Sequence, residues 1–144
     1  MKTFWDRCAE QDLRNYGLKA PNMEAIREEV GELEEKMISP KSAAFGKIPV
    51  QGGGINYEER LISEIYYAGK MRDNLEAFDR ESQRIEKALS LLPDEDVRVL
   101  RYLCIEGKRP ADFAAEYSYS VQWVYALKDR ALRDFCIARY GCSM

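Results

Sequence analysis

One long helical pattern occupies the middle of the chain. Apolar residues, with one serine among them, recur there at steps of three and four: Leu61, Ile65, Ala68, Met71, Leu75, Phe78, Ser82, Ile85, Leu89 and Leu92. These steps place side chains on one face of an α-helix. The pattern predicts a helix over 57–91, roughly 50 Å long at 1.5 Å per residue. We expect a homodimer through this helix, and the alternative is that it packs only within its own chain.

Two shorter helices are predicted before it. Trp5, Ala9, Leu13 and Tyr16 form one stripe of a helix over 3–16, and Gly17 is expected to end it. Pro21 then sits where the start of a helix tolerates proline. The second helix carries an apolar seam of Met23, Ile26, Val30, Leu33 and Met37, and Pro40 ends it. Together with the long helix, these segments predict a helical region over 1–92 that mediates oligomerisation.

Residues 39–56 read as a loop, because they hold two prolines and four glycines and show no sustained period. The run Gly52-Gly53-Gly54 is not a phosphate-binding loop. No Gly-Lys-Ser or Gly-Lys-Thr follows it, and no strand pattern precedes it. A loop of about eighteen residues is long for a compact domain, and loops of that length tend to be functional or mobile.

Three short helical patterns follow Pro93 and predict a separate domain over 93–144. The first covers 94–106, with Asp94 as its N-cap, Val97, Leu100 and Cys104 inward, and Gly107 after its end. The second covers 110–117. Only Ser118 and Tyr119 separate it from the cap of the third, which covers 121–138. Two short helices joined by so tight a turn predict a helix-turn-helix within an all-α fold.

Composition argues against several classes of function. The chain has no histidine, four cysteines without a Cys-x-x-Cys pair, and a net charge of −3. Histidine is the commonest general base, and zinc sites need closer ligand spacing, so we expect neither an enzyme nor a metal or other cofactor. No apolar run approaches the roughly 18 residues of a membrane span. The first twelve residues lack the apolar core of a secretion signal, so we expect a cytoplasmic protein with reduced thiols.

The third C-terminal helix is the candidate recognition helix. Val124, Leu127, Ala131, Leu132 and Phe135 are expected to face inward and Ser120 to cap the helix, which turns the opposite face outward. That face and its neighbours give the candidate DNA contacts: Ser120, Val121, Gln122, Trp123, Tyr125, Ala126, Lys128, Asp129 and Arg130. Gln122 can pair with adenine, and Val121 or Ala126 can touch a thymine methyl. Tyr125, Lys128 and Arg130 are expected to reach phosphates, whereas Trp123 either packs on helix 110–117 or contacts DNA.

The C-terminal part of the chain has no excess of basic residues that would indicate DNA binding. Residues 90–144 carry eight basic and eight acidic side chains. DNA-binding domains more often show a basic excess, because phosphate neutralisation supplies most non-specific affinity. The balance predicts weak non-specific binding to DNA.

The segment from Leu89 to Phe135 resembles region 4 of sigma-70-type sigma factors, the helix-turn-helix that reads the promoter −35 element. LSLLPDEDVRVLRYLCIEGK resembles its entry helices and SVQWVYALKDRALRDF its recognition helix. The whole chain resembles the phage late-gene transcriptional regulators of the ArpU and RinA types. The shared features are Ser39-Pro40, the three glycines, the long helix and the sigma-like end, in that order. Val121, Ala126, Ser118 and Arg109 stand where such helix-turn-helices more often carry other residues.

The resemblance implies a prophage-encoded regulator that binds double-stranded DNA upstream of late genes and contacts host RNA polymerase. Two other functions remain open. The first is a packaging protein that recognises phage DNA, because small terminase subunits also join helix-turn-helix units to oligomerising helices. The second is a helical assembly or interaction protein without DNA binding, which the even charge of 90–144 favours.

Overall fold

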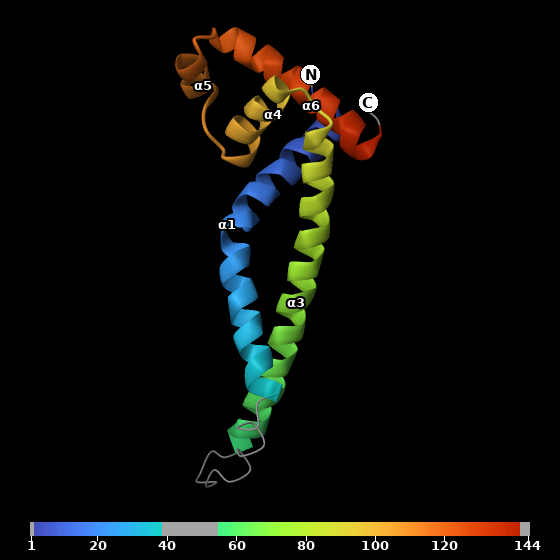
Figure 1. The fold of residues 1–144 in the computed structure, drawn as a ribbon, viewed down its shortest axis with the longest axis vertical. Helices are drawn as coiled ribbons and strands as arrows, with labels where there is room; N and C mark the ends of the chain where they lie inside the picture. Colours follow the sequence, from blue (N-terminus) through green and yellow to red (C-terminus); the bar gives the residue numbers. More distant parts are fainter. Residues whose placement is uncertain (1, 39–54, 142–144) are drawn as a thin grey trace. The chain divides into compact units, whose positions relative to one another are not determined.

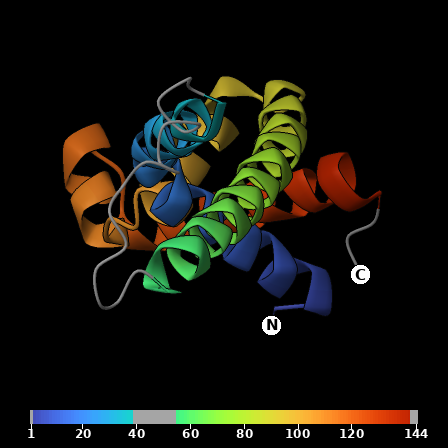
Figure 2. The same cartoon turned by 90° about the horizontal axis from the view of Figure 1, so that it is seen from below.

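The computed structural model describes residues 2–38 and 55–141, and every regular element in these ranges is helical. The predicted all-α fold is confirmed, and the coloured part of the chain in Figures 1 and 2 has helices and no strand arrows. The helices are α1 (Phe4–Ile38), α3 (Ile55–Ser90), α4 (Asp94–Leu100), a π-helical turn (Arg101–Ile105), α5 (Pro110–Tyr117) and α6 (Val121–Tyr140). Residues 39–54 of the predicted loop, including the three glycines, lie outside the described residues.

The chain divides into two compact units. Unit 1 comprises Met1–Pro21 and Arg80–Met144, and unit 2 comprises Asn22–Asp79. Both long helices pass from one unit into the other. The boundary predicted between residues 92 and 93 therefore falls inside unit 1, because the first part of α1 and the last part of α3 belong with the C-terminal helices.

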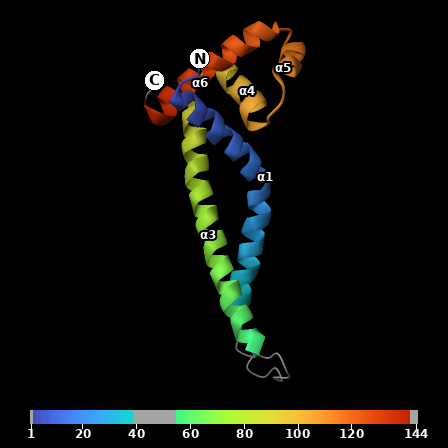
Figure 3. The ribbon, with the colours of Figure 1, turned by 180° about the vertical axis from the view of Figure 1, so that it is seen from behind.

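Unit 1 holds a continuous apolar core made by every helix of that unit. Ala9 and Leu13 come from α1, and Ile85 and Leu89 come from α3. Ala88 of α3 is buried with them, and the other buried members come from the C-terminal helices: Val99, Leu100, Leu103, Cys104, Phe113, Ala114, Val124, Leu127, Ala131, Leu132, Phe135 and Cys136. The start of α1 lies beside α6 in Figures 1 and 3. The Trp5 and Tyr140 rings make contact between these two helices, with centroids 5.2 Å apart.

Unit 2 is a pair of helical segments, 22–38 of α1 and 55–79 of α3, with a thin apolar seam. Only Val30, Ala68 and Leu75 are buried among its described residues. Three ion pairs cross the seam: Arg27 with Asp79 at 2.9 Å, Lys36 with Glu64 at 3.5 Å, and Arg72 with Glu34. Ile65 was predicted to face the seam but is 49% exposed, and Glu64 takes the inward position because it pairs with Lys36.

The predicted break between residues 17 and 21 is wrong, since α1 runs without interruption through Gly17 and Pro21. Gly17 is required by packing rather than by a helix end. A Cβ at this position would lie 1.9 Å from the carbonyl oxygen of Ile105. Pro21 has no N–H to donate to the carbonyl of Gly17, which removes one bond from the helix. The pattern of glycine and proline therefore marked a close backbone approach and the boundary between the two units.

Two other details of the C-terminal helices differ from expectation. Asp94 is the first residue of α4 and not its N-cap. Pro93 holds the cap position without a side-chain bond, so Asp94 instead places a carboxylate in the first turn, where the helix dipole favours it. The predicted helix 94–106 changes at Arg101 into the π-helical turn, and Gly107 follows with the positive φ of 71° expected after a helix end.

A homodimer was predicted through the apolar residues of the long helix, and two of the central ones are covered within the chain. Leu75 is 5% exposed and Ile85 is fully buried, so neither offers a free apolar surface to a second copy. A homodimer would need another face. The dimer itself stays a prediction.

Candidate nucleic-acid interface

A three-residue turn joins α5 to α6 and is held at both ends. Ser118 has the left-handed backbone expected of a position often filled by glycine, with φ 59° and ψ 40°. The Tyr119 N–H donates to the Ala114 carbonyl at 2.9 Å, and the Tyr119 ring stacks on Phe113 with centroids 6.1 Å apart. Ser120 then caps α6, because its Oγ accepts the Trp123 N–H at 3.1 Å. The predicted cap is confirmed.

The inner face of α6 follows the prediction residue by residue. All five side chains expected to face inward are buried: Val124, Leu127, Ala131, Leu132 and Phe135. Phe113 and Ala114 of α5 are buried as well, whereas Tyr117 is half-buried over Phe113, with ring centroids 4.6 Å apart. This packing fixes the rotation of α6 about its axis. It also determines which residues of α6 face solvent.

We call the exposed side chains on the first turns of α6 the α6 face: Val121, Gln122, Trp123, Tyr125, Ala126 and Asp129. Val121, Trp123 and Tyr125 are 42%, 46% and 51% exposed. Of the two positions considered for Trp123, the structure favours the exposed one over packing on α5. The face offers one amide, one phenol, one indole, two small apolar groups and one carboxylate to a partner.

Lys128 and Arg130 are placed differently from the rest of the predicted site. The Lys128 side chain is only 18% exposed, and its Nζ lies 3.9 Å from a carboxylate oxygen of Glu10 on α1. Arg130 donates to Asp96 at 2.8 Å and to Glu95 at 3.3 Å, both on α4. Both cations expected to bind phosphate therefore lie beside carboxylates inside unit 1, and Lys128 shares Glu10 with Lys2.

Asp96 is the acidic side chain whose role the sequence does not reveal. It is fully buried on α4 and faces Arg130 of α6. Asp134, one turn further along α6, lies beside it, and burial together with its hydrogen bond to Asp96 raises the pKa of Asp134. In the sequence, Asp96 is one of three acidic residues that open α4. Only the packing of α4 on α6 distinguishes it from its neighbours.

Other basic side chains around α5 are also engaged locally. The Lys108 Nζ lies 3.1 Å from Glu106 and 4.8 Å from the centroid of the Tyr102 ring. Arg109 pairs with Asp112 at 3.3 Å, and Arg98 stacks over Tyr117 at 5.1 Å. Cations held in such pairs attract phosphate less than free ones, because part of their charge is already neutralised. The α6 face therefore suits hydrogen bonding and apolar contact better than charge attraction.

Comparisons of the chain with models of protein families, with curated protein sequences and with solved structures found no match. Within the described ranges, no three histidine, cysteine or acidic side chains are grouped to hold a metal ion. The same ranges contain no helix with an apolar stretch sufficient to cross a lipid bilayer.

Proposed function

We propose that the protein is a sequence-specific DNA-binding transcription regulator whose recognition helix is α6. The α6 face is the observation that carries this proposal. A tight turn with a left-handed residue precedes α6, a serine caps it, and its inner side is buried, so its first turns project a defined set of side chains to solvent. Helix-turn-helix proteins place the first turns of their second helix against base edges in the major groove.

Recognition of the DNA sequence would depend on a few side chains of the α6 face. The Gln122 amide can donate to and accept from the N6 and N7 atoms of one adenine. Val121 and Ala126 offer methyl groups that fit the methyl of thymine. The Tyr125 hydroxyl can donate to a phosphate, which positions the helix without reading sequence. The exposed Trp123 indole has a surface that can lie against sugars at the groove edge.

Phosphate contacts should contribute less to DNA affinity here than in most DNA-binding regulators. Lys128 and Arg130, the basic side chains of α6 closest to its face, are paired with carboxylates. Because each neutralised phosphate contributes nearly one unit to the slope of log K against log salt, we expect a shallow slope. The proposed regulator would bind random DNA weakly and owe its site preference to base contacts.

The biological setting follows from the resemblance alone. It is that of a cytoplasmic, prophage-encoded activator of late genes that works with host RNA polymerase as a homodimer. These expectations are part of the proposal and depend on DNA binding. DNA binding by the α6 face is therefore tested first, because every other step requires the protein to bind its operator.

A selection experiment tests the proposal. Random duplexes are selected on the purified protein, and the enriched site is then measured against the wild type and Gln122→Ala. We expect the substitution to cost about 1–3 kcal/mol on the selected site and little on random DNA. Gln83→Ala removes an exposed amide from α3 and serves as the control, because Gln83 lies outside the α6 face. Unchanged binding by Gln122→Ala would show that α6 does not read bases.

The ion pairs of α6 favour a second candidate function. Lys128 with Glu10 and Arg130 with Asp96 are pairs that a helical assembly protein would use to fix its own fold. In that case the α6 face would contact protein. The same selection separates the two functions, because an assembly protein enriches no duplex sequence at ~150 mM salt.

A further inference from the structure

Among the residues that the structure describes, the second face of α3 in unit 2 has no apolar partner. Its seam residues Ala68 and Leu75 are buried against α1. Ile62 and Tyr66, which point away from that seam, are 66% and 62% exposed, and Ile65 is 49% exposed. Gly69 continues this second side with open space around it, since a Cβ there would meet nothing within 4 Å. We call Ile62, Ile65, Tyr66 and Gly69 the outer α3 face.

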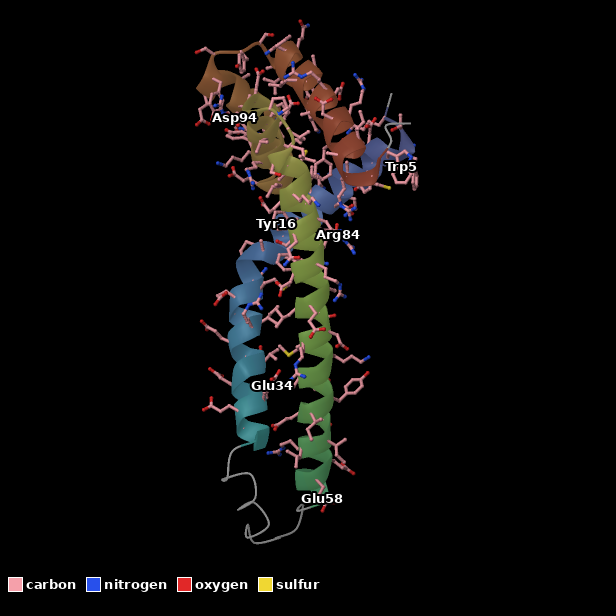
Figure 4. The ribbon with its side chains drawn as sticks, turned by 45° about the vertical axis from the view of Figure 1, so that its right-hand side comes forward. Trp5, Tyr16, Glu34, Glu58, Arg84 and Asp94 are labelled. Carbon is pink, nitrogen blue, oxygen red and sulfur yellow. The ribbon has the colours of Figure 1, made fainter. Side chains whose placement is uncertain are left out.

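Carboxylates stand at both ends of the outer α3 face. Glu58 and Glu59 precede it by one turn and Asp73 and Glu76 follow it, all of them exposed. Figure 4 labels Glu58 at the start of the helix. Glu58 and Asp73 are about 22 Å apart along the axis at 1.5 Å per residue. The face is therefore an apolar centre about two turns long with acidic groups at each end.

The basic side chains near this face do not cancel its acidic ends. Arg72 is turned toward α1, where its Nε donates to Glu34 at 2.8 Å. The Lys70 Nζ lies 5.4 Å from the centroid of the Tyr66 ring, beside the middle of the face. Residues 22–38 and 55–79 together carry twelve acidic and five basic side chains. Such an excess repels nucleic acid and anionic lipid surfaces, so the apolar centre points to a protein partner.

The charge pattern also argues against a second copy on this face. Two copies packed in parallel would place Glu58 and Glu59 against the same residues of the partner. Packed antiparallel about the centre, they would place Glu58 opposite Asp73. Both arrangements bring carboxylates together, and like charges facing each other across an interface cost affinity. The complementary surface has an apolar centre and basic groups at both ends.

We propose that the outer α3 face docks an amphipathic helix of another protein, with apolar residues at helical spacing and Lys or Arg at both ends. The apolar groups of that helix would cover Ile62, Ile65 and Tyr66, and Gly69 would let its backbone approach closely. Its end cations would meet Glu58 and Glu59 on one side and Asp73 and Glu76 on the other. Amphipathic helices bind hydrophobic protein surfaces through an apolar stripe at i, i+3, i+4 and i+7. This proposal stands apart from DNA binding by α6.

Selection of helical peptides tests this inference. A displayed library of twenty-residue helical peptides is selected on the full-length protein and counter-selected on the Ile62→Ser/Tyr66→Ser variant. Both side chains are exposed, so the variant should keep its fold, which circular dichroism checks. We expect enriched peptides to share an apolar stripe with Lys or Arg at both ends. A synthetic peptide of the consensus should bind the variant at least about tenfold more weakly than the wild type.

Charge reversal sharpens the test. Glu58→Lys/Asp73→Lys should weaken the consensus peptide several-fold, and a peptide with Glu at both ends should recover binding to this variant. Glu28→Lys/Glu32→Lys makes the matched change on exposed positions of α1 and should leave binding unchanged. Three results would overturn the proposal: no enrichment that depends on Ile62 and Tyr66, enrichment of peptides without basic ends, or sedimentation showing a homodimer that Ile62→Ser/Tyr66→Ser dissociates.

Discussion

Units 1 and 2 are built from the same two long helices but differ in packing and charge. Seventeen buried residues make the core of unit 1, whereas Val30, Ala68 and Leu75 are the buried residues among those described in unit 2. Unit 1 contains 15 basic and 13 acidic side chains, and unit 2 contains seven and twelve. The slight basic excess thus falls in the unit that presents the α6 face, and the acidic excess falls in the unit that presents the outer α3 face.

The comparison shows why counting charge along the chain is misleading here. A division at residue 90 gives a neutral C-terminal part, because residues 1–21 and 80–89, which carry seven basic and five acidic side chains, are counted with the acidic helices. In the structure these residues belong to unit 1. The spatial division thus places the proposed contact with DNA and the proposed contact with a basic helix in different units.

The difference in packing predicts the largest effects. Leu127→Ala removes a side chain that is 1% exposed in the core of unit 1 and should cost about 2–5 kcal/mol of unfolding free energy. Leu75→Ala is the matched change in the thin seam of unit 2 and should cost roughly 2 kcal/mol or less, because fewer neighbours surround the cavity. Urea unfolding followed by circular dichroism measures both. Equal losses would contradict the difference in packing.

Replacing a helical glycine with alanine should change stability in opposite directions in the two units. Gly17→Ala in unit 1 pushes a Cβ into the Ile105 backbone and should destabilise the protein by about 1–3 kcal/mol. Gly31→Ala in unit 2 has open space around the new Cβ and should stabilise it by roughly 0.5–1 kcal/mol, since alanine is the better helix former. Thermal unfolding of the two variants should shift in opposite directions. A stabilised Gly17→Ala would show that α1 and the π-helical turn do not meet as described.

Ion pairs should also differ between the units. Arg130→Ala leaves the fully buried Asp96 carboxylate without its cation and should cost about 1–3 kcal/mol. Arg27→Ala breaks an exposed pair with Asp79 in unit 2 and should cost less than about 1 kcal/mol. Chemical denaturation at pH 7 compares them. If the Arg130 variant lost no more stability than the Arg27 variant, Asp96 would not depend on Arg130.

The smallest effect concerns pH and belongs to unit 1. The Glu86 carboxylate accepts from Arg101 at 2.7 Å and from Tyr16 at 2.8 Å, and the hydrogen bond from Arg101 lowers the pKa of Glu86. A lowered pKa in the folded state contributes stability that is present above the unfolded pKa and lost as pH falls through the folded value. Glu86→Gln should therefore lose roughly 1 kcal/mol or less at pH 7, because the pair is partly exposed, and nothing near pH 2.

Denaturation of wild type and Glu86→Gln across this pH range tests the assignment. Gln83→Ala serves as the control, because Gln83 is exposed on the same helix and carries no charge. Its difference from wild type should not vary with pH. A Glu86→Gln deficit that stayed constant down to pH 2 would contradict the electrostatic origin.

Local patterns predicted most of the fold. The helix over 110–117 has the predicted bounds, Ile55–Ser90 lies within two residues of the predicted 57–91, and Ser120 caps α6 as expected. These features depend on side-chain spacing and on residues within one or two turns, which the sequence displays directly. The α6 face follows from them, because the inward residues determine the outward ones.

The remaining features depend on contacts between distant segments. The continuity of α1 depends on how Gly17 meets Ile105, which is 88 positions away. The pairing of Lys128 with Glu10 and of Arg130 with Asp96 arises only when α6 packs on α1 and α4. Spacing alone therefore predicted both cations as free phosphate contacts. It also could not show that Ile65 faces outward, since Glu64 and Ile65 both fit steps of three or four.

The proposal that α6 reads DNA is tested most directly by sequencing the genomic fragments that the purified protein retains at ~150 mM salt. We expect a few sharp peaks that share one motif, remain with Gln83→Ala and disappear with Gln122→Ala. Broad enrichment that falls steeply with salt would contradict base reading by α6, because phosphate contacts alone produce it. No enrichment at all would contradict DNA binding itself and leave the α6 face as a surface for protein.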